Sequence, residues 1–179
     1  MTETQDETDE SEEVSREEMD HLIRNHMYGS FGIGLIPFPF VDIAALTILQ
    51  VKLVKEIADA YEIPFSREKI KNVLFPLVSA VTPSFIAPSL TSLIKVVPIV
   101  GQTAGAVTMP VISGAVTYAT GQVFVSHFES GGTLLNINVA KMKAHYSDMF
   151  EKGKGIALNL KKEKEKEEEE QKETAAKED

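Results

Sequence analysis

The four histidines are the residues best suited to metal binding or acid–base chemistry, and their spacing argues against both. They stand at His21, His26, His127 and His145, and none belongs to an HExxH set. His21 and His26 are five positions apart, so on a helix they point in different directions. Glu18, three positions before His21, fits a surface pair better than a catalytic dyad. Since cysteine is also absent, we expect no metal site and no catalytic residue.

Two glycine-rich fragments share only their composition with phosphate-binding loops. The fragment GSFGIG (29–34) has the spacing GxxGxG rather than GxGxxG, and no strand is expected before it. A flexible joint between two helices is the better interpretation. Gly153-Lys154-Gly155 lacks the first glycine and the Ser or Thr of a GxxxxGKS/T loop. The sequence therefore predicts no cofactor, no nucleotide hydrolysis and no enzyme.

Two polar residues within an apolar stretch are candidates for contacts with a partner or another helix. Asp42 follows a Pro-Phe-Pro segment at the start of an expected helix, where a carboxylate faces the helix dipole and unpaired N–H groups. The alternative for Asp42 is a partner contact, or a buried ion pair with a lysine of another helix. Gln50, two turns further on, either hydrogen-bonds across a helix–helix interface or lies at the surface.

The formal charge of −9 belongs to the two ends of the chain. Residues 1–20 carry ten acidic side chains and one arginine, and residues 151–179 carry ten acidic side chains and eight lysines. We expect 1–15 to be a disordered acidic tail and 153–179 to be a charged Lys/Glu tail, either disordered or a solvated helix after a hinge at Gly153 and Gly155. Lysines matched by glutamates do not hold a phosphate backbone, so nucleic acid is excluded as a partner.

Apolar residues recur at helical spacing on both sides of the middle third, and no long alternation of strand type occurs. Pro64 ends the second helical stretch. The fold class is therefore predicted to be all-α, with a helical domain over residues 16–152. The helical stretches and their apolar positions are a first helix from about 14 (Met19, Leu22, Ile23, Met27), a second over 41–61 (Ala44, Ala45, Ile48, Leu49, Leu53, Ile57) and a third over about 138–152 (Val139, Met142, Tyr146, Met149, Phe150).

Two long runs between these helices have no Lys, Arg, Asp or Glu. They cover residues 73–94 and 96–128 and are separated by Lys95. A helix of 22 residues reaches roughly 33 Å, enough for a hydrocarbon core of about 30 Å. We therefore expect an apolar helical hairpin over about residues 70–128 that inserts into lipid. The alternatives are the buried centre of a soluble bundle, or a hairpin sheltered in solution that inserts conditionally.

Small residues recur four apart in the second run. They form the pairs Gly101/Gly105 and Ala115/Ala119, each on one helix face. Inside lipid, helices associate by close van der Waals contact, which small residues permit. We expect these four residues to be a helix-packing surface, against the first run or against a second copy of the chain.

The proline-rich start of the second helix resembles a known family. The run IPFPFVD (36–42), with Gln50 eight positions after its Asp42, and the run GQVFVSHFESGG (121–132) resemble the bacterial YcjF-like domain family of unknown function. The resemblance covers roughly residues 20–152. It implies a helical, membrane-associated domain that is often attached to, or encoded near, a small GTPase. Because this chain lacks a phosphate loop, such a GTPase would be a separate protein.

These observations together predict a non-enzymatic, membrane-associated helical scaffold or adaptor. Its expected partners are the lipid bilayer, a separate small GTPase and a second copy of the chain. Basic residues precede and follow the two runs, and only Lys95 lies between them, so we expect both termini in the cytoplasm. The resemblance implies that the membrane is the cytoplasmic membrane of a bacterium. The alternative is a soluble helical oligomer or interaction module, found in the supernatant without detergent. A pore would need charges along its path, and the runs themselves contain none.

Overall fold

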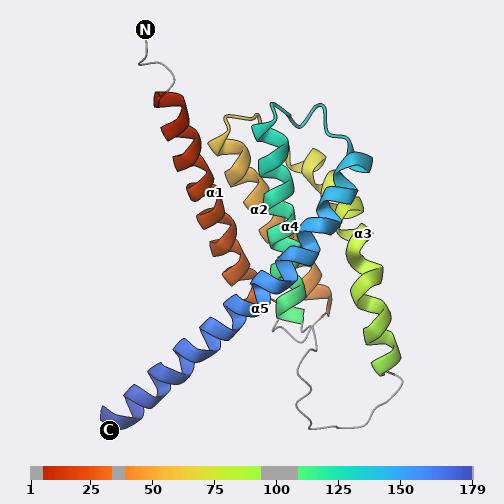
Figure 1. Cartoon of the computed structure of the whole chain (residues 1–179). Helices are drawn as coiled ribbons and strands as arrows, with labels where there is room; N and C mark the ends of the chain where they lie inside the picture. Colours follow the sequence, from red (N-terminus) through yellow and green to blue (C-terminus); the bar gives the residue numbers. More distant parts are fainter. Residues whose placement is uncertain (1–5, 34–38, 94–108, 179) are drawn as a thin grey trace.

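The protein is helical throughout the part of the chain that the computed structural model describes, which is residues 6–33, 39–93 and 109–178 (Figure 1). No strand occurs in these residues, and the predicted all-α class is confirmed. The helices are α1 (Asp6–Ile33), α2 (Pro39–Ala60), α3 (Arg67–Leu93), α4 (Met109–Glu129) and α5 (Val139–Glu178).

The central element is α4, most of whose residues are buried, although Ser126 and Glu129 near its end are exposed. It packs most extensively against α5 and α1 and also contacts α2 (Figure 1). Phe124, Val116 and Ala119 have almost no exposed surface, and burying each large apolar side chain contributes about 1.5–3 kcal/mol. An apolar surface around the whole helix is therefore matched here by protein neighbours.

The two membrane spans predicted from the uncharged runs are not supported. Within 6–33, 39–93 and 109–178, no helix combines the length and the apolarity needed to cross a bilayer. The hairpin predicted over about 70–128 is likewise not confirmed, because α3 contacts α5 and α2 more than it contacts α4. α4 is instead surrounded by other helices of the chain, chiefly α1 and α5, and α5 is 40 residues long.

Both outer helices are longer than their sequence patterns indicated. α1 begins at Asp6, so a helix occupies residues 6–15 where the acidic composition predicted disorder, and glutamate is a good helix former. α5 begins after Asn138, whose Oδ1 accepts a hydrogen bond from the Lys141 N–H at 3.1 Å and caps the helix. It then continues to Glu178. The core extends past residue 152, since Ala157 and Leu160 are buried.

The glycines expected to act as a hinge and a joint lie inside continuous helices. Gly153 and Gly155 are within α5, and Gly29 and Gly32 are within α1. A Cβ at Gly153 would lie 3.0 Å from the Ala115 carbonyl oxygen of α4. Gly153 therefore allows α5 to approach α4 closely, which explains a glycine in the middle of a helix better than flexibility does.

The bundle has two unlike ends. At one end α2 and α4 terminate and α3 and α5 begin, joined by residues 61–66 and 130–138 (Figure 1). We call this the polar end, because Glu62, Arg67 and Glu129 are exposed there. At the other end α1 and α3 terminate and α2 and α4 begin (Figure 1). We call it the apolar end, because the described side chains near the start of α2 (44–49) and of α4 (109–112) carry no formal charge.

Candidate functional site

A hydrogen-bonded polar layer crosses the centre of the bundle. The Nε2 of Gln50 on α2 donates to the Thr117 hydroxyl of α4 at 2.9 Å, and this hydroxyl donates to the Ser113 carbonyl oxygen at 2.8 Å. Gln50 is only 3% exposed. Its Oε1 is buried and has no hydrogen-bond partner among the described residues. An unpaired buried amide oxygen is costly, so this position is not optimised for stability.

The layer continues on the side of α4 that faces α5. Tyr146 of α5 is fully buried, and its hydroxyl lies 3.3 Å from the Thr120 hydroxyl and 3.4 Å from the Val116 carbonyl oxygen. Burial raises the pKa of Tyr146 far above its ordinary value, and the bond with Thr120 offsets only part of this rise. The tyrosine hydroxyl is therefore neutral at physiological pH. We define the buried polar layer as Gln50, Ser113, Thr117, Thr120 and Tyr146.

The chemistry of this layer favours helix positioning over catalysis. Its side chains are hydroxyls and one amide, without a carboxylate or imidazole to act as a base. In the described ranges, no three His, Asp or Glu side chains gather to hold a metal ion. Hydrogen bonds are directional, so those made by Gln50 and Tyr146 set the rotation of α2 and α5 about α4.

The unpaired oxygen of Gln50 leads to a testable prediction. We expect Gln50→Leu to leave the free energy of unfolding unchanged or to raise it by up to about 1 kcal/mol, because the variant removes a buried unsatisfied atom and the Thr117 hydroxyl keeps its bond to Ser113. Urea unfolding followed by circular dichroism measures the difference. Gln50→Ala serves as the comparison and should be less stable, since it leaves a cavity. A large loss in Gln50→Leu would show that the layer contributes to stability.

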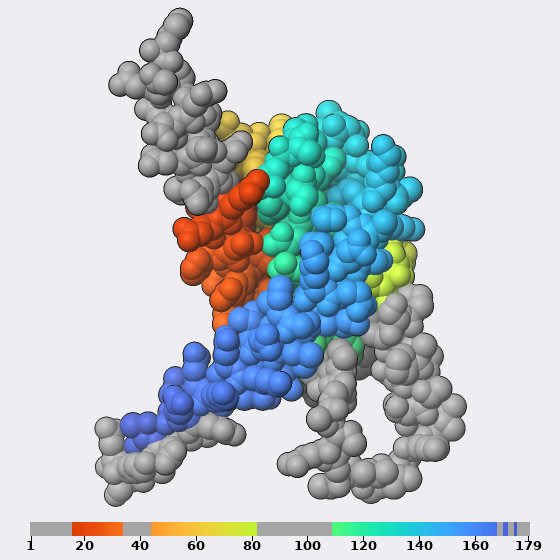
Figure 2. All heavy atoms as spheres, viewed as in Figure 1, coloured from red at the N-terminus to blue at the C-terminus, as the bar shows by residue number. Residues whose placement is uncertain are grey.

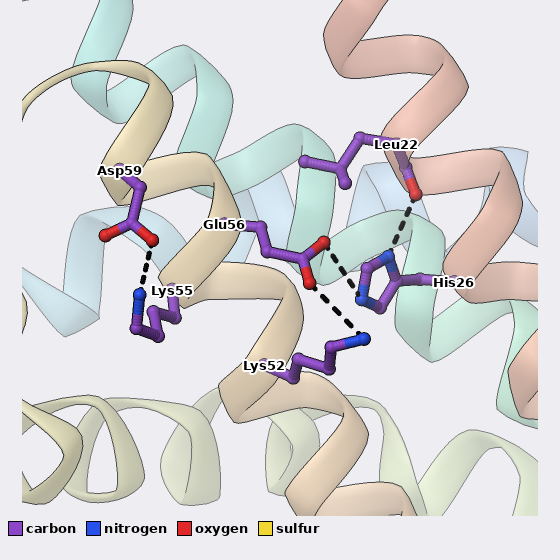
Figure 3. Close-up of polar contacts among 6 residues, drawn as sticks. All are labelled: Leu22, His26, Lys52, Lys55, Glu56 and Asp59. Carbon is purple, nitrogen blue, oxygen red and sulfur yellow. Dashed lines mark hydrogen bonds and ion pairs between the residues drawn. The ribbon is translucent and has the colours of Figure 1, made fainter.

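A second set of polar residues connects α1 to α2 near the surface (Figure 3). The Nε2 of His26 lies 3.6 Å from Oε2 of Glu56, and the Lys52 Nζ lies 3.4 Å from Oε1 of the same carboxylate. One turn further along α2, Lys55 pairs with Asp59. We define the interhelical triad as His26, Lys52 and Glu56.

The structure separates the residues that the sequence singled out. Gln50 lies in an interhelical hydrogen bond, one of the two roles left open for it. Asp42 belongs to the first turns of α2, and its side chain lies outside the described part. Gly101 and Gly105 also lie outside the described residues. Ala115 and Ala119 are both fully buried on α4.

Two residues that matter for this arrangement were missed as site residues in the sequence. Tyr146 was identified only as one member of an apolar stripe, because a tyrosine at helical spacing looks like any core residue. His26 was considered only as a metal ligand or an acid–base group, and not as a contact between helices. The carboxylate beside it comes from residue 56, thirty positions along the chain, and no local pattern reveals such a pair.

Comparisons with known proteins place this architecture in a family. The family model described as "Domain of unknown function (DUF697)" matches residues 4–155. "Magnetosome membrane protein 22" of the bacterium Magnetospirillum gryphiswaldense is 35% identical over 139 residues, which are 77% of this chain and 71% of the relative. No solved structure matches the chain significantly. The family match over most of the chain and the similarity to this relative show that the chain belongs to the DUF697 family.

Proposed function

We propose that this chain is a non-enzymatic helical scaffold or adaptor that associates with a bacterial membrane through the apolar end of the bundle. The observation that carries the proposal is the 35% identity to a relative whose name describes it as a membrane protein. The two uncharged runs of the sequence support the same assignment. Contact with the bilayer, rather than a span across it, is the form of association proposed.

Apolar surface near the apolar end supports a lipid contact. Residues 44–49 of α2 are mostly apolar, and none of them is buried. Further along the same helix, the apolar residues Val51, Leu53, Val54, Ile57 and Ala58 are buried. Met109, the first residue of α4, is 50% exposed. The free energy falls when apolar side chains at one end of a bundle enter the boundary between headgroups and acyl chains.

The course of α5 limits how deeply this end can enter. α5 leaves the bundle obliquely on the side of the apolar end (Figure 1, Figure 2). The sequence of its projecting part is rich in lysine and glutamate. Lys161 pairs with Glu165 on this part at 3.4 Å. Charges at the centre of a bilayer are costly, so the proposed contact is shallow and keeps α5 in water or along the headgroups.

Flotation with lipid vesicles tests the proposal. We expect the purified full chain to float with phosphatidylcholine vesicles, and Met109→Glu to reduce the bound fraction several-fold, because a carboxylate opposes entry into the interface. Leu135→Glu is the matched control, since Leu135 is 82% exposed at the polar end. Equal binding by the two variants would contradict the assignment of the apolar end.

The burial of α4 favours a second candidate, which is an interaction module that stays in water. A helix covered by α1, α2 and α5 needs no lipid to shield its apolar surface. Under this alternative the wild-type chain remains at the bottom of the flotation gradient and is recovered from cells without detergent. Light scattering would then measure whether it forms oligomers.

The YcjF-like resemblance implies a separate small GTPase as the partner. We also propose that both termini of the chain are cytoplasmic. A small GTPase changes its conformation between the GTP-bound and GDP-bound states. An adaptor should therefore bind one of these two states of the GTPase more tightly than the other. Affinity capture from gently solubilised membranes, with a non-hydrolysable GTP analogue or with GDP, measures this difference. Recovery of no GTPase in either state would remove the adaptor part of the proposal.

A further inference from the structure

The charges of α3 are confined to its first turns. The helix carries no formal charge after Lys71, which leaves residues 72–93 uncharged. The residues of α3 that the structure places in the core recur at helical spacing and share one face; they are Ile70, Val73, Leu74, Leu77 and Val81. Phe75 lies outside this face and is 78% exposed. The bundle therefore covers one face of this helix and leaves an aromatic side chain on the opposite face uncovered.

The polar group next to Phe75 is satisfied within the helix. Ser79 is exposed, and its hydroxyl donates a hydrogen bond to the Phe75 carbonyl oxygen at 2.7 Å. A serine hydroxyl that bonds the carbonyl four positions earlier leaves no unpaired donor. Lipid requires that polar groups be satisfied internally. The outward face of α3 around Phe75 and Ser79 is therefore compatible with an apolar environment.

The last turns of α3 run past the beginnings of α2 and α4 at the apolar end (Figure 1). After Val81 the helix continues through the twelve residues 82–93, TPSFIAPSLTSL. Twelve helical residues rise by about 18 Å, whereas one leaflet with its headgroups is about 20 Å thick. This segment is long enough to enter one leaflet and too short to cross both, in agreement with the absence of a spanning helix among the described residues.

We infer that residues 82–93 of α3 enter the leaflet nearest to the bundle and end within it, at the boundary between headgroups and acyl chains. The inference rests on the proposed contact between the apolar end and a bilayer, and it adds which helix enters and how deeply. Phenylalanine, isoleucine and leucine alternate with serine and threonine in this segment, a composition that suits the boundary better than the centre of the bilayer. α4 stays within the protein, because most of its residues are already buried by other helices.

Single-site fluorescence tests the inference, because the chain has no native cysteine or tryptophan. Ser89→Cys and Asn72→Cys would each be labelled in the full chain with an environment-sensitive fluorophore and mixed with phosphatidylcholine vesicles. We expect emission from position 89 to rise several-fold and shift to the blue, because the label there enters the boundary. Quenchers attached near the headgroup end of the acyl chains should act on it more strongly than quenchers near the bilayer centre. Asn72, exposed in the first turns of α3, is the control, and its label should not respond.

The inference and the proposed function fail in different ways. If the wild-type chain does not float with vesicles, the bilayer contact fails and the inference fails with it. If the chain floats but emission from position 89 is unchanged, or the deep quenchers act more strongly, the contact stands and the inference is overturned.

A blue shift that grows with protein concentration without vesicles would assign this segment to a second copy of the chain, which would also overturn the inference. Leu90→Trp covers the case in which a labelled variant fails to fold, since it needs no label. Its emission should shift to the blue with vesicles and not without them, and an emission that vesicles leave unchanged would contradict lipid entry.

Discussion

The Gly153→Leu variant is expected to lose about 3 kcal/mol or more of its free energy of unfolding. A Cβ at this position would lie 3.0 Å from the Ala115 carbonyl oxygen, 3.1 Å from the Ala115 Cα and 3.1 Å from Cδ1 of Tyr118. Two of these atoms are backbone and cannot rotate away, so a larger side chain must separate α5 from α4. Urea unfolding monitored by circular dichroism measures the loss.

Gly155, two residues further along α5, provides the matched control. A Cβ there would meet nothing within 4 Å. Gly155→Ala should therefore raise the free energy of unfolding by up to about 1 kcal/mol, since alanine is the better helix former. If Gly153→Leu were tolerated as well as Gly155→Ala, the close contact between α4 and α5 would be wrong.

Truncation of Tyr146 is the second large effect. Tyr146 is fully buried between α5 and α4, so Tyr146→Ala should cost about 3–5 kcal/mol, from lost apolar burial and the cavity that remains. Tyr146→Phe keeps the ring and should cost about 0.5–1.5 kcal/mol, because it removes only the hydroxyl contacts with Thr120 and Val116. Calorimetric or urea unfolding of both variants at pH 7 measures the two losses. Similar losses in the two variants would contradict the packing of the ring.

The same hydroxyl gives the fold a dependence on alkaline pH. Burial raises the pKa of Tyr146 in the folded chain, whereas an unfolded tyrosine ionises near pH 10. The stability contribution is therefore complete below about pH 10 and falls at higher pH by up to about 1.4 kcal/mol per unit. Between pH 10 and 11 the wild type should lose about 1 kcal/mol more than Tyr146→Phe. Parallel pH dependences of the two proteins would contradict a buried neutral hydroxyl.

Helical periodicity was enough to predict which faces of the outer helices are buried. Met19, Ile23 and Met27 were predicted as one apolar stripe, and all three are in the core. The same holds for Met142 and Phe150 of α5. Such stripes identify a helix and its buried face because each residue turns the chain by a constant angle, whatever helix lies opposite.

The partners of the candidate site could not be predicted in this way. Gln50 was recognised as a residue that could bond across an interface, but its partner Thr117 lies 67 positions away in the sequence. The packing role of Ala115 was expected, but against the first apolar run or a second copy, whereas the structure places Gly153 of α5 against it. The residue pattern of one helix indicates the size and polarity of the surface that packs against it. It does not indicate which segment of the chain provides that surface.

The sequence by itself determined that the chain is helical, that it is uncharged over most of residues 73–128, and that no cysteine chemistry is available to it. Only the tertiary structure decided what surrounds the part of this stretch that forms α4. Side chains of α1, α2 and α5 and acyl chains are similarly apolar, so a helix that is apolar on all sides is compatible with either neighbour. Whether protein or lipid surrounds α4 depends on contacts such as Phe31 with Gly114 and Tyr146 with Thr120. These contacts exist only after distant segments have packed together.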